Sequence, residues 1–166
     1  MLWYAIHVRS NFERQVVQFL RGRRGPETFL PTYRTKSRRV AVTEPVERPL
    51  FPGYLFAHLA SLAEERVAVL QAPGVVRLVE FGGRAVPVDD ETIDSLRIIV
   101  SNPTAARPHP LLREGHVVHV VAGPFAGAVG RLSRSRGRKP RLVVTIEILG
   151  RAAAVSVDLA DVEPFG

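Results

Sequence analysis

Hydrophobic and polar positions alternate differently in the two parts of the chain, and the first part opens as a strand followed by a helix. Residues 2–8 (LWYAIHV) are rich in aromatic and β-branched side chains, which predicts a strand. Apolar residues then recur at helical spacing. We expect Ser10 or Asn11 to cap this helix, and Gly22 and Gly25 to end it.

The next segments predict two further strands. Residues 27–33 (ETFLPTY) have strand composition, although Pro31 indicates an edge or a bulge. The polar residues 34–49 predict a hairpin or loop, and residues 54–58 predict a strand that starts after a Pro-Gly turn. Side chains alternate between the two faces of a strand, so Leu55 should face the core while Tyr54 and Phe56 share the other face.

Two more helices complete the first part. Residues 61–71 predict a helix with Leu62, Val67 and Leu70 turned inward. Residues 75–81 (VVRLVEF) predict a strand, and a helix that starts at residues 89–90 carries its apolar side chains on one face, namely Ile93, Leu96 and Ile99. Strands mixed with three short helices predict an α+β domain over residues 1–100.

The composition changes at residues 101–110 (SNPTAARPHP), where three prolines among small polar residues predict a flexible linker. Beyond it every apolar run has strand character, including residues 117–121, 142–149 and 152–159. Residues 111–166 therefore predict a small all-β barrel, in which closure removes exposed strand edges.

Composition narrows the class of protein. The 166 residues are 46% hydrophobic, which supports a real core. There is no cysteine, no apolar run approaches the roughly 20 residues that span a bilayer, and the N-terminus does not resemble a signal peptide. We therefore expect a soluble, cytoplasmic protein.

No arrangement of residues predicts catalysis. His116 and His119 would face opposite sides of a strand, so they should not share a metal ion. The chain contains no phosphate-binding loop of the GxxxxGK[ST] type and no nucleophile motif. The acidic residues 89–91 are explained by helix capping. We expect no enzyme activity, no cofactor and no metal site.

The net charge of +7 is unevenly distributed: +7 over residues 1–40, −4 over residues 41–100 and +4 over residues 101–166. Arginine binds phosphates in bidentate fashion, so a basic zone is consistent with nucleic-acid binding. It is equally consistent with a charged face that only contacts solvent. The second basic zone, residues 131–141 (RLSRSRGRKPR), has six basic residues and no acid. It could be a solubilising loop or a nucleic-acid contact.

Several motifs in this order resemble one family. WYAIHVRSNFE, FLPTY, PLFPGYLF and APGVVRLVEFGG resemble the N-terminal (NGN) domain of the NusG family of transcription elongation factors. REGHVVHVVAGPFAGAVGRL and IEILGRAAAVSVDLADVEP resemble the family's C-terminal KOW domain, an SH3-like barrel. The resemblance thus implies an NGN domain over residues 1–100, a linker over 101–110 and a KOW domain over 111–166.

The resemblance also implies partners. Such a factor binds RNA polymerase through its NGN domain, touches the non-template DNA strand of the transcription bubble, and suppresses pausing or termination. Its KOW domain recruits a second partner, a ribosomal protein or the termination factor Rho. We expect a monomer that contacts no membrane. A stand-alone RNA-binding KOW protein is the alternative from another class.

Two branches of the family remain open. The basic turn SRSRGRKPR replaces an acidic stretch of the general factors, and alanines follow Gly150 and Arg151. These features resemble specialised, operon-specific antiterminators of the UpxY and LoaP kind, whereas a general NusG would couple polymerase to Rho or the ribosome. The β-branched alternation in VVTIEI and AAVSVDL predicts a stable barrel that does not refold into helices.

The resemblance implies site residues in the NGN domain. The polymerase-facing pocket maps onto an aromatic group, and we expect Tyr54 and Phe56 to form an exposed patch there. Its members are Trp3, Tyr4, Phe51, Tyr54 and Phe56. Arg66 lies where specialised relatives contact polymerase, although the hydroxyl residues typical of that contact are missing. The residues expected to face DNA are Arg9, Arg14, Arg38 and Arg39.

In the KOW domain, Phe125 occupies the turn that family members use for partner contact, and we expect it to be exposed. Ile148, Leu149 and Arg151 lie on a neighbouring element. These four residues are the expected binding site for the second partner.

Overall fold

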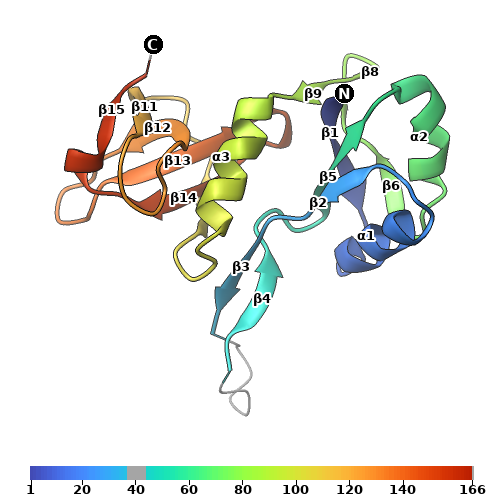
Figure 1. Cartoon of the computed structure of the whole chain (residues 1–166), viewed down its shortest axis with the longest axis horizontal. Coiled ribbons are helices and arrows are strands. Elements are labelled where there is room, and N and C mark those ends of the chain that lie inside the picture. The colour runs from blue at the N-terminus through green and yellow to red at the C-terminus, as the bar shows by residue number, and fades with distance from the viewer. Residues whose placement is uncertain (37–43, 166) are drawn as a thin grey trace. The chain divides into compact units, whose positions relative to one another are not determined.

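The computed structural model describes residues 1–36 and 44–165, which form two compact units (Figure 1). The N-terminal unit comprises Met1–Pro31 and Phe51–Asp90. The barrel unit comprises Thr32–Leu50 and Glu91–Gly166. In the part of the chain that the structure describes, no helix is long and apolar enough to cross a membrane.

The N-terminal unit is built on an antiparallel five-stranded sheet. The strands follow the order β2-β5-β1-β6, and β9 pairs with the start of β1. Their bounds are β1 Leu2–Val8, β2 Glu27–Phe29, β5 Tyr54–Leu59, β6 Val75–Leu78 and β9 Pro87–Val88. A small hairpin, β7 (Glu80–Phe81) with β8 (Arg84–Ala85), follows β6.

Two helices contribute to the core of this unit. In α1 (Glu13–Gly22) Val16 and Leu20 are buried, and in α2 (Leu62–Leu70) Val69 is buried. All three join the cluster that holds Ile6 and Leu55 of the sheet. The helix at 61–71 exists as predicted, and Leu62 packs against the core cluster as expected. The other two inward assignments are wrong, because Val67 is 59% exposed and Leu70 is also exposed.

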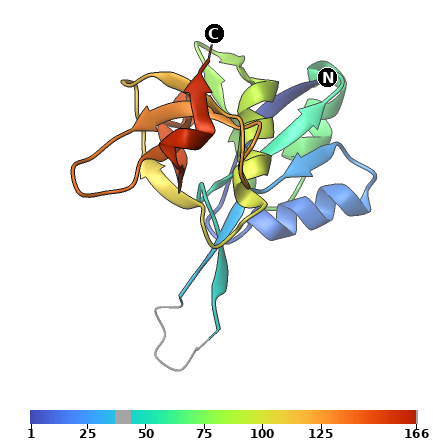
Figure 2. The same ribbon diagram turned by 60° about the vertical axis from the view of Figure 1, so that its left-hand side comes forward.

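The barrel unit holds a six-stranded antiparallel sheet in the order β10-β14-β13-β12-β11-β15 (Figure 2). Its strands are β10 Arg107–Pro110, β11 Val117–Val120, β12 Val129–Ser133, β13 Arg141–Ile146, β14 Arg151–Ser156 and β15 Val162–Pro164. Short 3-10 turns, η1 (Glu147–Leu149) and η2 (Leu159–Asp161), precede and follow β14. The strand character expected for this part of the chain is confirmed.

Two further elements are grouped with the barrel strands. Helix α3 (Asp90–Val100) buries Ile93, Leu96 and Ile99 as predicted, and the Ser95 hydroxyl accepts a hydrogen bond from the Val129 amide at 2.9 Å. The hairpin of β3 (Thr32–Thr35) and β4 (Val46–Pro49) is joined to the 101–106 segment, because the Arg34 amide donates to the Pro103 carbonyl at 2.8 Å.

Five expectations about boundaries need correction. The strand over 75–81 is divided into β6 and β7, and the strand over 152–159 ends at Ser156, before η2. The linker over 101–110 is wrong in its second half, because residues 107–110 form β10 and pair with β14. The strand over 27–33 is interrupted between Phe29 and Thr32, where Pro31 has no amide hydrogen to offer. The strand over 142–149 ends at Ile146, because η1 tightens the chain before Gly150 takes a left-handed conformation. The domain boundaries at 100 and 111 stay a prediction about which parts fold independently.

Candidate functional site

The face assignment predicted for β5 is confirmed. Strand β5 pairs with β1 so that Phe56 lies opposite Ala5 and Tyr54 opposite His7. Leu55 and Ala57 belong to the core cluster on the side of the helices. Tyr54 and Phe56 therefore share the other face, which we call the aromatic face; it also carries Trp3, His7 and His58.

The exposure expected for Phe56 on this face is wrong. Phe56 is fully buried, and the rings of Phe29 and Phe51 each lie 6.2 Å from its ring. Phe51 meets Phe56 edge to face at 85°, a favourable arrangement for aromatic pairs. Rings from three separate segments thus cover one another, and only the half-buried Tyr54 remains accessible from the expected patch.

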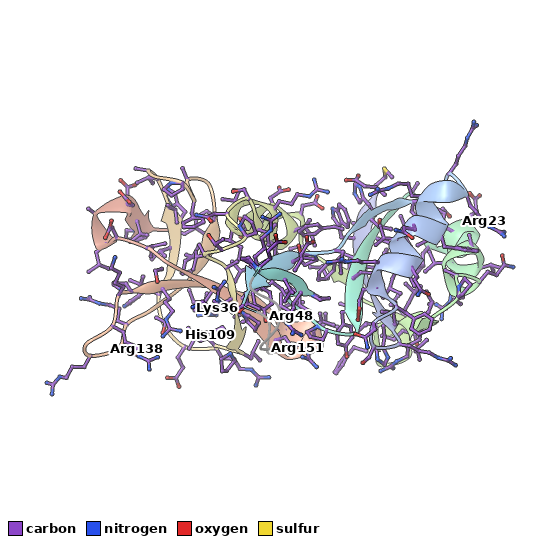
Figure 3. All side chains as sticks on the ribbon, turned by 90° about the horizontal axis from the view of Figure 1, so that it is seen from below. Arg23, Lys36, Arg48, His109, Arg138 and Arg151 are labelled. Atoms are coloured by element: carbon purple, nitrogen blue, oxygen red, sulfur yellow. The ribbon has the colours of Figure 1, made fainter. Side chains whose placement is uncertain are left out.

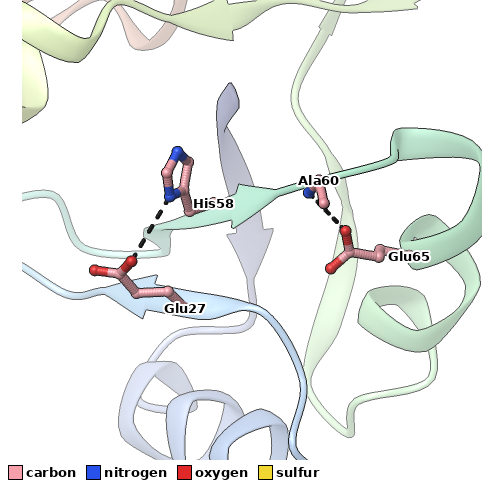
Figure 4. Close-up of polar contacts among 4 residues, drawn as sticks. All are labelled: Glu27, His58, Ala60 and Glu65. Carbon is pink, nitrogen blue, oxygen red and sulfur yellow. Dashed lines mark hydrogen bonds and ion pairs between the residues drawn. The ribbon is translucent and has the colours of Figure 1, made fainter. Parts of the chain in front are cut away.

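Trp3 and Tyr4 take opposite sides of the sheet. Trp3 stacks flat on His58, with ring centroids 4.5 Å apart and an interplanar angle of 7°. The Nδ1 atom of His58 in turn lies 3.6 Å from a carboxylate oxygen of Glu27 (Figure 4). Tyr4 belongs to the core cluster on the helix side, so it does not contribute to the aromatic face.

Three of the four N-terminal motifs meet at the end of β1. The Val8 amide donates to the Gly53 carbonyl at 2.8 Å, and the Arg9 amide donates to the Gly74 carbonyl at the same distance. Gly74 has a φ of +98°, and a β-carbon there would lie 2.7 Å from the Phe12 ring. The segments from WYAIHVRSNFE, PLFPGYLF and APGVV are therefore bound together by backbone contacts, and we call this junction the motif junction.

Glu13 completes the motif junction, and the sequence did not single it out. Its side-chain carboxylate accepts hydrogen bonds from the Gly53 amide at 3.1 Å and from the Asn11 amide at 3.2 Å. The residue is only 5% exposed. Because 40 residues separate Glu13 from Gly53, no local pattern could have paired them.

The expected capping of α1 by Ser10 or Asn11 is wrong. The helix begins after Phe12 without a side-chain cap, and Asn11 has a φ of +70°. The Glu13 carboxylate binds the Asn11 amide instead. In α2, by contrast, Ser61 accepts from the Glu64 amide at 3.4 Å and caps the helix.

Arg66 has an internal partner. Its guanidinium contacts the Glu80 carboxylate at 2.6 Å, and both side chains are partly exposed. The preceding Glu65 accepts hydrogen bonds from the Ala60 and Ser61 amides at 2.6 and 2.9 Å, the first of which is drawn in Figure 4. This part of α2 thus uses its charged groups to close the helix start and to bind β7.

The arginines expected to face DNA are only partly described. Arg9 and Arg14 are exposed, at the motif junction and on α1 respectively. Arg38 and Arg39 lie outside the described residues. Of the other arginines in this zone, Arg23 stacks over the Phe19 ring at 4.5 Å.

The expected exposure of Phe125 in the barrel unit is also wrong. Phe125 is 7% exposed and lines a small cavity of about 140 Å³ with Val120, Val157 and Asp161. The turn that carries it is closed by the Gly127 amide, which donates to the Val120 carbonyl at 2.8 Å. Ile148 and Leu149 are half-buried on η1, and Arg151 is exposed at the start of β14.

Comparison with known proteins gives a consistent result. The family described as "Transcription termination factor nusG" matches residues 1–97. The chain is 31% identical to the transcription termination/antitermination protein NusG of Vibrio vulnificus, covering 97% of this chain and 94% of that one. It is 29% identical to the protein of the same name from Thermus thermophilus, over 96% of each chain.

A solved structure supports the fold. The structure titled "Domain interaction in Thermotoga maritima NusG" matches 99% of this chain with a TM-score of 0.55. Its sequence is 23% identical, so this likeness bears on architecture alone.

Proposed function

Because this chain belongs to the NusG family of transcription termination and antitermination proteins, we propose that it binds RNA polymerase and suppresses pausing or termination. The family match over residues 1–97 carries the proposal, since it covers the N-terminal unit, where the motif junction and the aromatic face lie. The chain acts by binding and not by making or breaking bonds.

We propose that polymerase meets the aromatic face at Tyr54. Tyr54 is half-buried and stacks on His7 with ring centroids 5.2 Å apart, so it offers a rigid and partly accessible ring. Aromatic side chains of this kind are common anchors of protein interfaces. Phe51, Phe56 and Trp3 are buried and stabilise the sheet that carries Tyr54, while Tyr4 packs in the core and Arg66 binds Glu80.

Other residues are proposed for the contacts with DNA and with the second partner. We propose that Arg9 and Arg14, with Arg38 and Arg39, approach the non-template DNA strand, where arginine can bind phosphates. Ile148, Leu149 and Arg151 would contact the second partner, whereas the buried Phe125 would stabilise its own turn.

The identity of the second partner separates the two branches of the family. Full-length relatives named NusG favour the general factor, which uses Rho or a ribosomal protein. The basic residues 131–141 favour a specialised antiterminator. Capture of Rho by the full chain supports the first reading, and its absence supports the second.

Capture of core RNA polymerase by the immobilised full chain tests the polymerase proposal. Tyr54→Ala should reduce retention at least tenfold, because truncation of a central interface aromatic typically costs about 2 kcal/mol or more. Phe81→Ala is the matched control, since Phe81 is 77% exposed on the β7–β8 hairpin, which is not part of the sheet that carries the aromatic face. Equal retention of the two variants would remove Tyr54 from the site.

A further inference from the structure

The basic residues 131–141 take part in a groove that the proposed function does not use. The groove has a volume of about 440 Å³ and lies within the barrel unit. Its floor consists of small or apolar residues, and its cations are Arg107, Arg138, Lys139 and Arg141. The floor is made by Ala105, Ala154, Val155 and Ser156. No acidic side chain lines the groove.

Strand pairing explains why cations stand on both sides of this floor. Arg107 of β10 lies opposite Ala154, and Arg141 of β13 lies opposite Ser156. Ala154 and Ser156 are two residues apart on β14, so all four side chains share one face of the sheet. Strand spacing and residue rise place the two arginine Cα atoms roughly 12 Å apart. This spacing favours a ligand with repeated charges over a single small anion.

The charges on the groove walls are available to a ligand. Among the described residues, none of the four cations makes an ion pair with another side chain. Arg107 lies over the Tyr33 ring at 5.6 Å and donates to the Ala106 carbonyl at 2.7 Å, contacts that orient it without neutralising its charge. Arg138, marked in Figure 3, is exposed on the β12–β13 loop with Lys139.

We propose that this groove binds the phosphodiester backbone of a nucleic-acid strand. A concave surface with cations of one sign concentrates field and tracks a polyanion. The groove has no aromatic lining on which bases could stack, so its affinity should depend on salt and little on sequence. The groove belongs to the barrel unit, whereas the proposed polymerase site belongs to the N-terminal unit, so nucleic-acid binding here does not depend on the polymerase proposal.

Anisotropy of a labelled 12-nucleotide oligouridine RNA, titrated with the full chain at several salt concentrations, tests this inference. Loss of two phosphate contacts should lower the slope of log affinity against log salt by about 1.4, since each contact contributes about 0.7 for single strands. If the two proteins bind equally at 1 M salt, this difference in slope predicts about 25-fold weaker binding of Arg138→Gln/Arg141→Gln at 0.1 M salt. The single variant Arg138→Gln, in an exposed loop, should lose about fivefold even if the double variant folds poorly.

The matched control removes two exposed arginines outside the groove, Arg84 and Arg113. Arg84→Gln/Arg113→Gln has the same net charge as the double variant and should bind like the unmodified chain. Equal losses of affinity in both double variants would mean that net charge alone attracts RNA, and would overturn the proposal that the groove binds it.

Competitors identify the ligand. Displacement by unlabelled single-stranded RNA, by single-stranded DNA or by duplex DNA supports the phosphodiester assignment and shows which strand the groove prefers. Equal displacement by polyglutamate of the same length would assign the groove to an acidic peptide and overturn the proposal.

Discussion

Glu13 offers the sharpest test of the structural reasoning, because one buried carboxylate binds two segments of the motif junction. Its hydrogen bond to the Gly53 amide is buried, and its bond to the Asn11 amide is partly buried. Hydrogen bonds to charged groups contribute more than neutral ones, so we assign about 2 kcal/mol to the first bond and about 1 kcal/mol to the second. Glu13→Ala should therefore lower the free energy of unfolding by about 3 kcal/mol.

A conservative variant and a control separate this effect from others. Glu13→Gln keeps a carbonyl oxygen as acceptor but loses the charge, so about half the cost is expected. Glu64→Ala removes another glutamate from the first turn of a helix, where the helix dipole favours a negative charge. Glu64 is exposed, and its removal should change the free energy of unfolding by less than about 0.5 kcal/mol.

Urea unfolding followed by tryptophan fluorescence measures these changes in the free energy of unfolding of the N-terminal unit. Trp3 is the single tryptophan, and it lies on β1 of the N-terminal unit. With a urea dependence of about 2 kcal/mol per M, the midpoint should fall by about 1.5 M for Glu13→Ala and about 0.7 M for Glu13→Gln. A midpoint for Glu13→Ala that matches the Glu64→Ala midpoint would refute the role of the carboxylate.

Two further substitutions test packing in the N-terminal unit with the same assay. Phe56→Ala should cost about 3–5 kcal/mol, because it empties a fully buried site, whereas the exposed Phe81→Ala should change stability by less than about 0.5 kcal/mol. Gly74→Ala should cost more than about 2 kcal/mol, because its β-carbon meets the Phe12 ring, while Gly82→Ala, with a φ of +63° and open space around it, should cost only about 1 kcal/mol. Equal costs within either pair would contradict the contacts described.

The sequence predicted what depends on local periodicity. Strand β1, helices α1 and α3 and the two faces of β5 follow from the spacing of apolar residues, and the structure confirms them. It did not predict which residues cover a face. Phe56 is buried because Phe29 arrives from β2 and Phe51 packs on it from the turn before β5, and Val69 replaces Val67 as an inward residue of α2. Both outcomes depend on tertiary neighbours that a spacing of 2 or 3.6 residues cannot specify.

At the motif junction, residues that maintain the fold differ from residues that could bind a partner, although the sequence motifs contain both. The F-P-G-Y element was expected to provide the polymerase-binding aromatics, yet the Gly53 backbone binds Val8 and Glu13, and Phe51 packs under Phe56. Most of the residues that make the chain recognisable therefore hold the sheet together, and Tyr54 is the one aromatic side chain of this element that stays partly accessible. A motif that maintains a fold is shared by proteins with different partners, so these residues identify the fold and exposed residues identify the partner. Differences in partner should instead follow from exposed residues outside the junction, such as the cations of the barrel groove, which packing leaves free to vary.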